Sequence, residues 1–313
     1  MSSVLEVNRP DNGPWKTERS TGVAQITWSR FRRHPGARAG AVVLLVMVLA
    51  VLLATLSPYD PEISDLTHQL QPPSWAHPMG TDALGRDLLT RVLYGGRVSL
   101  TVGLLVVGIT LTIGVTVGAL AGYAGGTVDS VLMRITDAAL TLPSLLVLVL
   151  LGAILRDIDL PLLKQNSVVT IAVVIGILSW MTFARLVRAS ILTLRELDFV
   201  TAARAVGASP GRIIMRHILP NAVGPITVEA TLELGYAIIE ESGLSFLGFG
   251  IQPPTPSWGN LLSNAQENFL RYPWLAIFPG VMIFLAIVSV NYIGDGLRDA
   301  FDPYKVLQQA GEM

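Results

Sequence analysis

Long apolar runs separated by polar stretches dominate the sequence. A membrane-spanning helix needs about 20 mostly apolar residues, and six windows meet this requirement. They cover approximately residues 39–56, 99–123, 131–155, 168–187, 223–239 and 274–293. The third window is interrupted by Asp137 and Pro143, and the fifth contains Glu229 and Glu233. This pattern predicts an all-α integral membrane protein with about six transmembrane helices.

Composition supports a lipid environment and excludes several kinds of chemistry. Hydrophobic residues make up 51% of the chain and charged residues 14%, whereas a soluble domain carries about 25% charged residues. The net charge is −1, so no overall basic field points to nucleic acid. The chain has no cysteine and only four scattered histidines. We therefore expect no metal site and no cofactor in this chain.

Arginines predict the direction of the helices, because positive side chains near helix ends favour the cytoplasmic side. One group precedes the first window and a second group lies between the fourth and the fifth. These are Arg30, Arg32, Arg33 and Arg38, and then Arg185, Arg188, Arg195, Arg204, Arg212 and Arg216. With six helices, both groups and both termini share the cytoplasmic side. Arg86 and Arg91 in the long loop after the first window run against this orientation.

Polar stretches divide the chain into four parts. We expect a mobile cytoplasmic tail over residues 1–30, ending in a short amphipathic piece near Trp28 and Phe31. Residues 31–98 would form the first transmembrane helix and a long extracytoplasmic loop. Residues 99–297 would form the transmembrane core, with the loop at 198–220 inside it, and residues 298–313 a cytoplasmic tail.

Three glycines recur at four-residue spacing in the second window, at Gly114, Gly118 and Gly122. Such a row lets two helices approach closely in lipid. The alternative is the ordinary enrichment of glycine in transmembrane helices.

Residues 198–220 predict a helix–turn–helix outside the membrane. Apolar residues recur at i, i+3, i+4 and i+7, namely Phe199, Ala202, Ala203 and Val206. Gly207 suits the left-handed position that ends a helix, Ser209 and Pro210 suit the start of the next, and we expect Pro220 to end it. The unit would insert into a groove of a partner protein, or lie on lipid headgroups through its arginines.

This loop resembles the EAA motif of ABC importer permeases, in which Glu-Ala-Ala is followed by three residues, a glycine and a distal Leu-Pro. Ala202, Ala203, Gly207, Leu219 and Pro220 match, while Thr201 stands where many members have glutamate. The resemblance implies that the loop couples to a cytoplasmic ATPase. The residues it assigns to coupling are Thr201, Ala202, Ala203, Arg204, Gly207, Leu219 and Pro220.

Longer blocks are similar to the second permease subunit of dipeptide, oligopeptide and nickel importers. They are SPYDP at 57–61, HPMGTDALGRDLLTRVLYGGRVSL at 77–100 and ESGLSFLGFGIQPPTPSWGNLL at 241–262. The resemblance implies the type I ABC importer fold in a bacterial inner membrane. It also implies a second homologous permease, two ABC ATPases and an extracytoplasmic substrate-binding protein as partners. ATP and Mg²⁺ would bind the ATPases, since this chain lacks the G-x-x-x-x-G-K-[ST] phosphate loop.

Glu229 and Glu233 share a helical face in the fifth window. Charges inside a membrane usually face a cavity or a partner. These two would line a translocation path or pair with an arginine of the second permease, unless the helix starts later and leaves them at the headgroups. Glu240 and Glu241 would line the outer end of the path.

Two other charged groups have alternative interpretations. Arg134 and Asp137 are expected to form a local ion pair. Asp82, Arg86 and Asp87 either hold a turn in the extracytoplasmic loop or contact the binding protein or partner permease.

Rival functions are a secondary transporter or channel, a nickel permease and an intramembrane enzyme. The first needs no structured basic loop between helices. The enzyme interpretation is weak because Ser245 lacks a G-x-S-x-G context, H-E-x-x-H is absent, and the histidines lie outside the windows. A peptide is the favoured cargo, since no His or Cys cluster suggests nickel.

Overall fold

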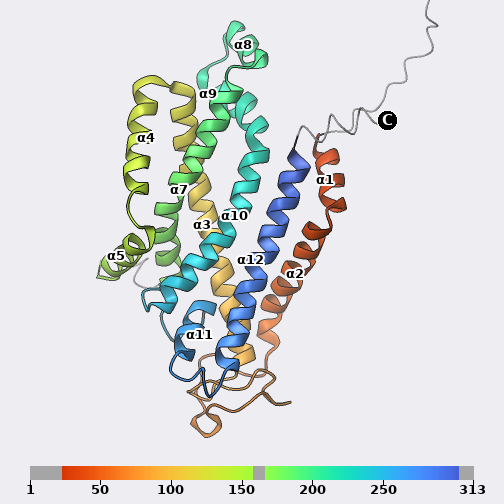
Figure 1. The fold of residues 1–313 in the computed structure, drawn as a ribbon, viewed down its shortest axis with the longest axis vertical. Coiled ribbons are helices and arrows are strands. Elements are labelled where there is room, and N and C mark those ends of the chain that lie inside the picture. The colour runs from red at the N-terminus through yellow and green to blue at the C-terminus, as the bar shows by residue number, and fades with distance from the viewer. Residues whose placement is uncertain (1–22, 158–165, 303–313) are drawn as a thin grey trace, which may run out of the picture.

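The computed structural model describes residues 23–157 and 166–302. Over these ranges the chain is helical, and its one β-type pairing is an isolated bridge between Thr81 and Asp87. Figure 1 shows the helices running roughly along one axis as an elongated bundle. The helices are α1 (Val23–Arg33), α2 (Pro35–Leu52), η1 (Leu53–Leu56), η2 (Leu66–His68), α3 (Leu88–Ala124), α4 (Gly126–Leu140), α5 (Ser144–Asp157), α7 (Ser167–Leu194), α8 (Asp198–Ala205), α9 (Pro210–Ile213), η3 (Ile214–Ile218), α10 (Leu219–Phe246), α11 (Trp258–Ala265) and α12 (Trp274–Phe301).

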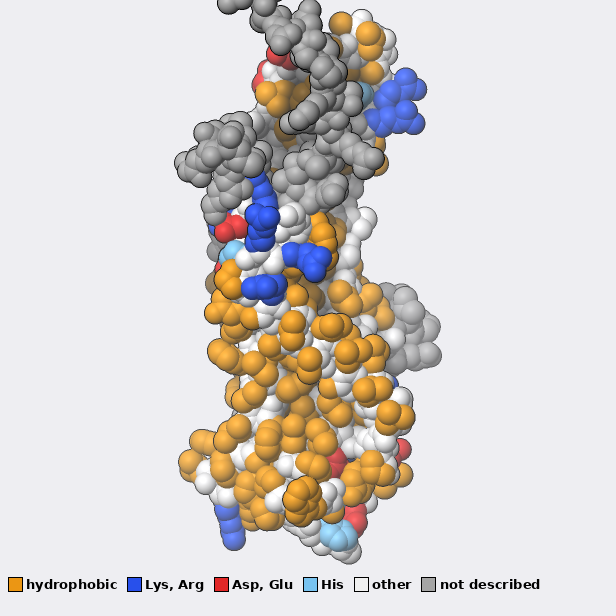
Figure 2. All heavy atoms as spheres, turned by 90° about the vertical axis from the view of Figure 1, so that its right-hand side faces the viewer, with side chains coloured by type: hydrophobic (Ala, Val, Ile, Leu, Met, Phe, Trp, Pro, Cys, Tyr) orange, Lys and Arg blue, Asp and Glu red, His pale blue; other side chains and the backbone are white. Residues whose placement is uncertain are grey.

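Five helical segments are long and apolar enough to cross a membrane. They are Pro35–Leu56, Leu88–Ala124, Ser167–Leu194, Pro210–Phe246 and Trp274–Phe301. Each contains one of the predicted windows, so the all-α membrane architecture is confirmed. Figure 2 shows a broad surface of hydrophobic side chains below a group of Lys and Arg side chains, the arrangement expected where a lipid-facing belt meets a headgroup region.

The remaining window, 131–155, is not one straight helix. α4 and α5 meet at an angle of 90° across a short break that contains Pro143, a residue that lacks the N–H a continuous helix would need. The expected ion pair between Arg134 and Asp137 is wrong, because Asp137 instead faces Arg185 of α7, with Oδ1 3.8 Å from Nη1. Nearby, Arg188 of α7 forms a bidentate pair with Asp129 of α4.

α3 begins at Leu88, earlier than the predicted start at residue 99. The Asp87 carboxylate accepts a hydrogen bond from the Thr90 amide at 2.8 Å, which satisfies one of the free N–H groups of the first turn. Arg91 is buried, and its Nη1 donates to the Pro61 carbonyl at 2.6 Å. The boundary drawn at residue 98 therefore falls inside a helix.

The glycine row of α3 packs against α7. A Cβ added at Gly118 would lie 2.5 Å from the Ala184 carbonyl oxygen, and one at Gly114 would lie 3.0 Å from the Phe183 side chain. A Cβ at Gly122 would lie 3.0 Å from the Arg188 carbonyl oxygen. The row is thus a site of close helix approach within this chain, as the packing interpretation predicted.

α1 and α2 lie against α12 on one side of the bundle (Figure 1). α1 has the amphipathic character expected near residue 30, and its Trp28 and Phe31 rings stack with centroids 5.9 Å apart. A Cβ at Gly40 would lie 2.6 Å from the Ser289 carbonyl oxygen, so α2 and α12 also touch through small residues. Of the predicted tails at 1–30 and 298–313, residues 1–22 and 303–313 lie outside the described residues. The rest of both is helical rather than tail, because α1 begins at Val23 and α12 continues to Phe301.

Candidate functional site

Residues 198–218, here called the knob, connect α7 to α10 at one end of the bundle. The knob contains α8, α9 and η3, and α8 lies at the top of Figure 1, beyond the ends of the long helices. Val200, Ala203, Ile213 and Ile218 are buried and pack with Ile191 of α7. The knob is therefore held firmly on the end of the helices that it connects.

Gly207 shapes the turn between α8 and α9. Its φ is +80°, a conformation that glycine adopts without a Cβ penalty. The Ala208 amide donates to the Ala203 carbonyl at 3.1 Å and the Gly207 amide donates to the Arg204 carbonyl at 3.0 Å, which is the Schellman pattern of hydrogen bonds. Pro210 opens α9 as predicted, whereas Ser209 makes no side-chain capping bond.

The outer face of α8 is exposed and partly apolar. Phe199 and Val206 are 37% and 84% exposed, Thr201 and Ala202 are also exposed, and only Ala203 of the predicted apolar stripe is buried. Arg204 lies over the Tyr123 ring at the end of α3, with its Cζ 5.6 Å from the centroid. Most of this stripe thus remains free to meet another molecule.

The prediction that Pro220 ends the second short helix is wrong. The helix continues from Pro210 to Phe246, with a π-helical turn at Ile214–Ile218, and Leu219 and Pro220 form the first turn of α10. A proline cannot donate the usual helical hydrogen bond, and the wider π-turn just before it accommodates that missing donor. The knob is consequently continuous with α10.

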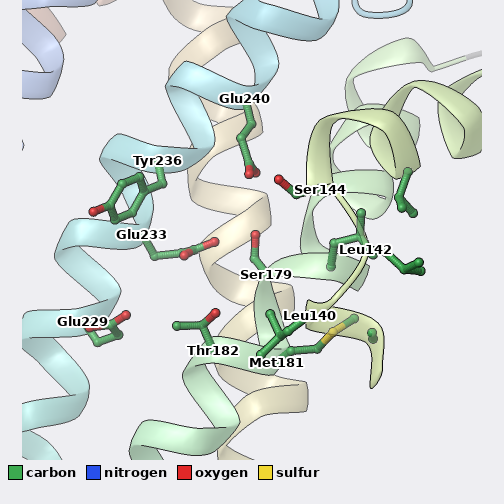
Figure 3. A pocket seen from close by; sticks show the side chains of 13 residues that line it. Leu140, Leu142, Ser144, Ser179, Met181, Thr182, Glu229, Glu233, Tyr236 and Glu240 are labelled. Carbon is green, nitrogen blue, oxygen red and sulfur yellow. The ribbon is translucent and has the colours of Figure 1, made fainter. Parts of the chain in front are cut away.

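A cavity of about 450 Å³ lies between α10, α7 and the α4–α5 bend. Figure 3 shows Glu229, Glu233 and Glu240 of α10 beside it, opposite Ser179 and Thr182 of α7. The glutamates recur on one face because they are four and seven residues apart. Glu229, Glu233 and Glu240 were all named from the sequence. Ser179 and Thr182 were not, although their i, i+3 spacing in an apolar helix was a usable signal.

Glu241 does not line this cavity. Its side chain is fully buried on another face of α10, where Oε2 accepts from the Ser99 hydroxyl at 2.8 Å and Oε1 accepts from the Ser245 hydroxyl at 2.7 Å. Ser99 also accepts from the Trp258 amide at 3.2 Å. Glu241 therefore joins α10 to α3 and α11, and the expectation that it lines the outer path is corrected.

Asp82, Arg86 and Asp87 are buried and satisfied within their own loop. Arg86 Nε donates to Asp82 Oδ2 at 2.8 Å, and Asp87 Oδ1 lies 2.9 Å from His77 Nδ1 while its Oδ2 caps α3. These contacts match the turn-holding interpretation, because all three side chains are engaged within the loop itself.

The same loop contains a second small polar cluster around Asp65. Hydrogen bonds from the Thr67 side chain, His68 and the Thr67 amide lower the pKa of Asp65 to about 2. The loop is thus ordered by its own short-range hydrogen bonds.

Family models match most of the chain. The model described as "Binding-protein-dependent transport system inner membrane component" matches residues 114–305. The model described as "N-terminal TM domain of oligopeptide transport permease C" matches residues 23–73.

Individual relatives give the same result. A dipeptide transport system permease protein of Alkalihalophilus pseudofirmus is 40% identical over 297 residues, covering 93% of this chain and 94% of that protein. A glutathione transport system permease protein of Pectobacterium atrosepticum is 41% identical over 278 residues, covering 88% and 89%. A di/tripeptide transport system permease protein of Pseudomonas aeruginosa is 39% identical over 283 residues, covering 88% and 90%.

Among solved structures, a chain of the inward-facing methionine ABC transporter MetNI is similar in fold. The TM-score is 0.53 at 19% identity, and the match covers 67% of this chain and 96% of that chain. The helical bundle, the family models and the full-length relatives agree, and the chain belongs to the binding-protein-dependent transport system inner membrane component family, as a multi-pass permease subunit with the ABC importer fold.

Proposed function

We propose that this chain pairs with a second homologous permease to form a path for di- or oligopeptides across a bacterial inner membrane. An extracytoplasmic binding protein delivers the peptide, and two cytoplasmic ABC ATPases bind ATP and Mg²⁺ and supply the driving energy. This chain itself holds no cofactor and catalyses no reaction.

The single observation that carries the coupling proposal is the knob. It exposes an apolar face at Phe199 and Val206 while its inner residues Val200 and Ala203 are buried. It continues directly into α7 and α10, the two helices whose polar residues line the cavity. A partner that grips and displaces the knob would therefore move both cavity walls together, a gating cycle between two arrangements.

The orientation with the knob in the cytoplasm is supported by the arginines. The last turn of α1 contains Arg30, Arg32 and Arg33, and α1 lies toward the same end of the bundle as the knob (Figure 1). Positive residues at helix ends favour the cytoplasmic side. Both termini then face the cytoplasm and the loop at 57–87 faces outward.

A peptide cargo is supported by the relatives, whose names refer to dipeptide, di/tripeptide and glutathione transport. The cavity volume of about 450 Å³ is within the usual range for small-ligand sites, about 300–1,000 Å³. These relatives favour peptide over nickel, and an ATP-driven importer over a secondary transporter or channel.

The proposal is tested by placing a charge on the exposed knob face. Val206→Asp should abolish ATPase co-purification and ATP-dependent peptide uptake, because a carboxylate would be desolvated in an apolar contact. The matched control is Leu270→Asp, since Leu270 is 87% exposed in the segment between α11 and α12. Normal co-purification and uptake in the Val206 variant would contradict the proposal.

A further inference from the structure

The carboxylates of the cavity form a row along one wall. Glu229, Glu233 and Glu240 lie beside the space between α10 and α7 (Figure 3), and Tyr236 of α10 also borders the cavity. Since a helix rises about 1.5 Å per residue, the row extends over roughly 16 Å. An extended peptide covers that length with about five residues.

Glu233 lacks a full set of partners. It is 9% exposed, and its Oε1 is buried without a hydrogen-bond partner. A buried carboxylate that lacks a counter-charge is costly, and in a membrane such groups usually face a cavity or a partner. Glu233 therefore lies in the cavity with unused capacity to bind a cation.

The surrounding charges do not neutralise the row. No Arg, Lys or His lines the cavity, and no ion pair found among the described residues involves Glu233 or Glu240. Arg185, one turn beyond Thr182 on α7, is paired with Asp137. Glu229 also borders a second cavity, which Arg298 lines. A positive charge is therefore near Glu229, and the inference rests on Glu233 and Glu240.

The rest of the cavity wall is neutral, with the hydroxyl groups of Ser144, Ser179 and Thr182 set among apolar side chains. Its hydrophobic side chains are Ala139, Leu140, Leu142, Val147, Leu178 and Met181. The described residues contain no group of three His, Cys, Asp or Glu side chains close enough to hold a metal ion. Separated carboxylates opposite a neutral wall of hydroxyl and apolar side chains match an organic ammonium or guanidinium ion with an apolar body better than a metal ion.

We propose that the cavity binds the positively charged groups of its cargo through Glu233 and Glu240, and so favours peptides with basic side chains over neutral and acidic ones. This inference rests on the proposed function. It assigns part of the selectivity to the permease itself rather than to the binding protein alone.

The test measures uptake by the complete transporter in proteoliposomes, with the permease pair, the ATPases and the binding protein present. Wild type is compared with Glu233→Gln, Glu240→Gln and Glu233→Asp, using tri-alanine and the same peptide with a central lysine or glutamate. Glu267→Gln serves as the control, because Glu267 is exposed outside this cavity. The binding protein is identical throughout, so its own preference cancels in the ratios between variants.

We expect Glu233→Gln and Glu240→Gln to lower the lysine-to-alanine uptake ratio by about tenfold, the effect of losing one charged hydrogen bond, and to raise the uptake of the glutamate peptide. Glu233→Asp and the control should keep the wild-type ratio.

An unchanged ratio in both Gln variants, or an equal loss for all three peptides, would overturn the inference. If either Gln variant no longer co-purified with the second permease, the inference would also be overturned, because the glutamates would then pair with that subunit instead. Failure of wild type to import any peptide would instead contradict the proposed function.

Discussion

Gly207 is the residue on which the shape of the knob depends most directly. Its φ of +80° permits the Schellman turn, and no atom lies within 4 Å of a Cβ built there. The requirement for glycine is therefore conformational and does not come from crowding.

Replacing Gly207 with valine should weaken ATPase docking while leaving membrane insertion intact. A β-branched residue in the left-handed region costs about 1–2 kcal/mol, which would distort the turn that presents α8. Gly207→Asn is the matched control, because asparagine tolerates this conformation. Co-purification with the ATPases reports the effect, and wild-type docking by the valine variant would contradict it.

Glu241 is the residue whose role differs most from the sequence-based expectation. It lies in a polar network with Ser99, Ser245 and the Trp258 amide that connects α10, α3 and α11. We expect Glu241→Leu to lower stability strongly, because each buried hydroxyl left without a partner costs about 1–3 kcal/mol. Glu241→Gln retains an acceptor and should be destabilised less. Thermal unfolding in detergent measures the difference, and equal melting temperatures for the two variants would contradict this role.

Residue roles were predictable where local backbone chemistry decides them. Gly207 and Pro210 were placed correctly because a left-handed turn and a first helical turn each favour one residue type. Pro220 was misjudged, since a π-turn upstream accommodates its missing donor. The burial of Asp82 and Arg86 depends on how the loop folds back on itself, and no local pattern reports that.

At the scale of helices, the α3–α7 contact offers a controlled test of packing. A Cβ at Gly118 would meet the Ala184 carbonyl, whereas a Cβ at Gly108 would meet nothing within 4 Å. Both substitutions to alanine raise helix propensity by about 1 kcal/mol, but only Gly118→Ala must separate two backbones, at a cost of about 1–3 kcal/mol. We expect Gly118→Ala to lower the melting temperature relative to Gly108→Ala. The reverse order would show that the glycine row is not a packing site.

The apolar runs predicted which segments form transmembrane helices, but they did not predict where those helices end or bend. Arg91 and Arg97 made residues 88–98 look like loop, but the Asp87 cap and the burial of Arg91 extend α3 through them. Pro143 and Asp137 signalled an interruption in the third window, but the 90° angle there is a matter of tertiary structure, in which α4 and α5 each contact α7.

At the scale of the whole molecule, α1 is tied to the end of α12. Arg30 Nη1 donates to the Asp302 carbonyl at 3.4 Å, and the Phe31 ring lies close to Gly296. Deleting residues 1–22 should barely change peptide uptake, whereas deleting residues 1–33 should reduce it by removing this contact. A large loss of peptide uptake after the shorter deletion would contradict this expectation and would show that residues 1–22 contribute to transport.

The cavity and the knob together define how the permease would work. α7 and α10 each contribute residues to the cavity and are joined through the knob, so force applied at one end reaches the cargo site through two continuous helices. Energetic coupling of this kind needs a rigid element with two arrangements. This coupling mechanism therefore depends on which protein the knob contacts.

The most direct measurement uses a single thiol on the knob. The chain has no cysteine, so Val206→Cys creates a unique probe at an 84% exposed position. In sealed inside-out vesicles that contain the complete transporter, a thiol-reactive crosslinker should join position 206 to an ATPase subunit. Reaction only from the external face, or failure to crosslink to any second protein, would contradict the account.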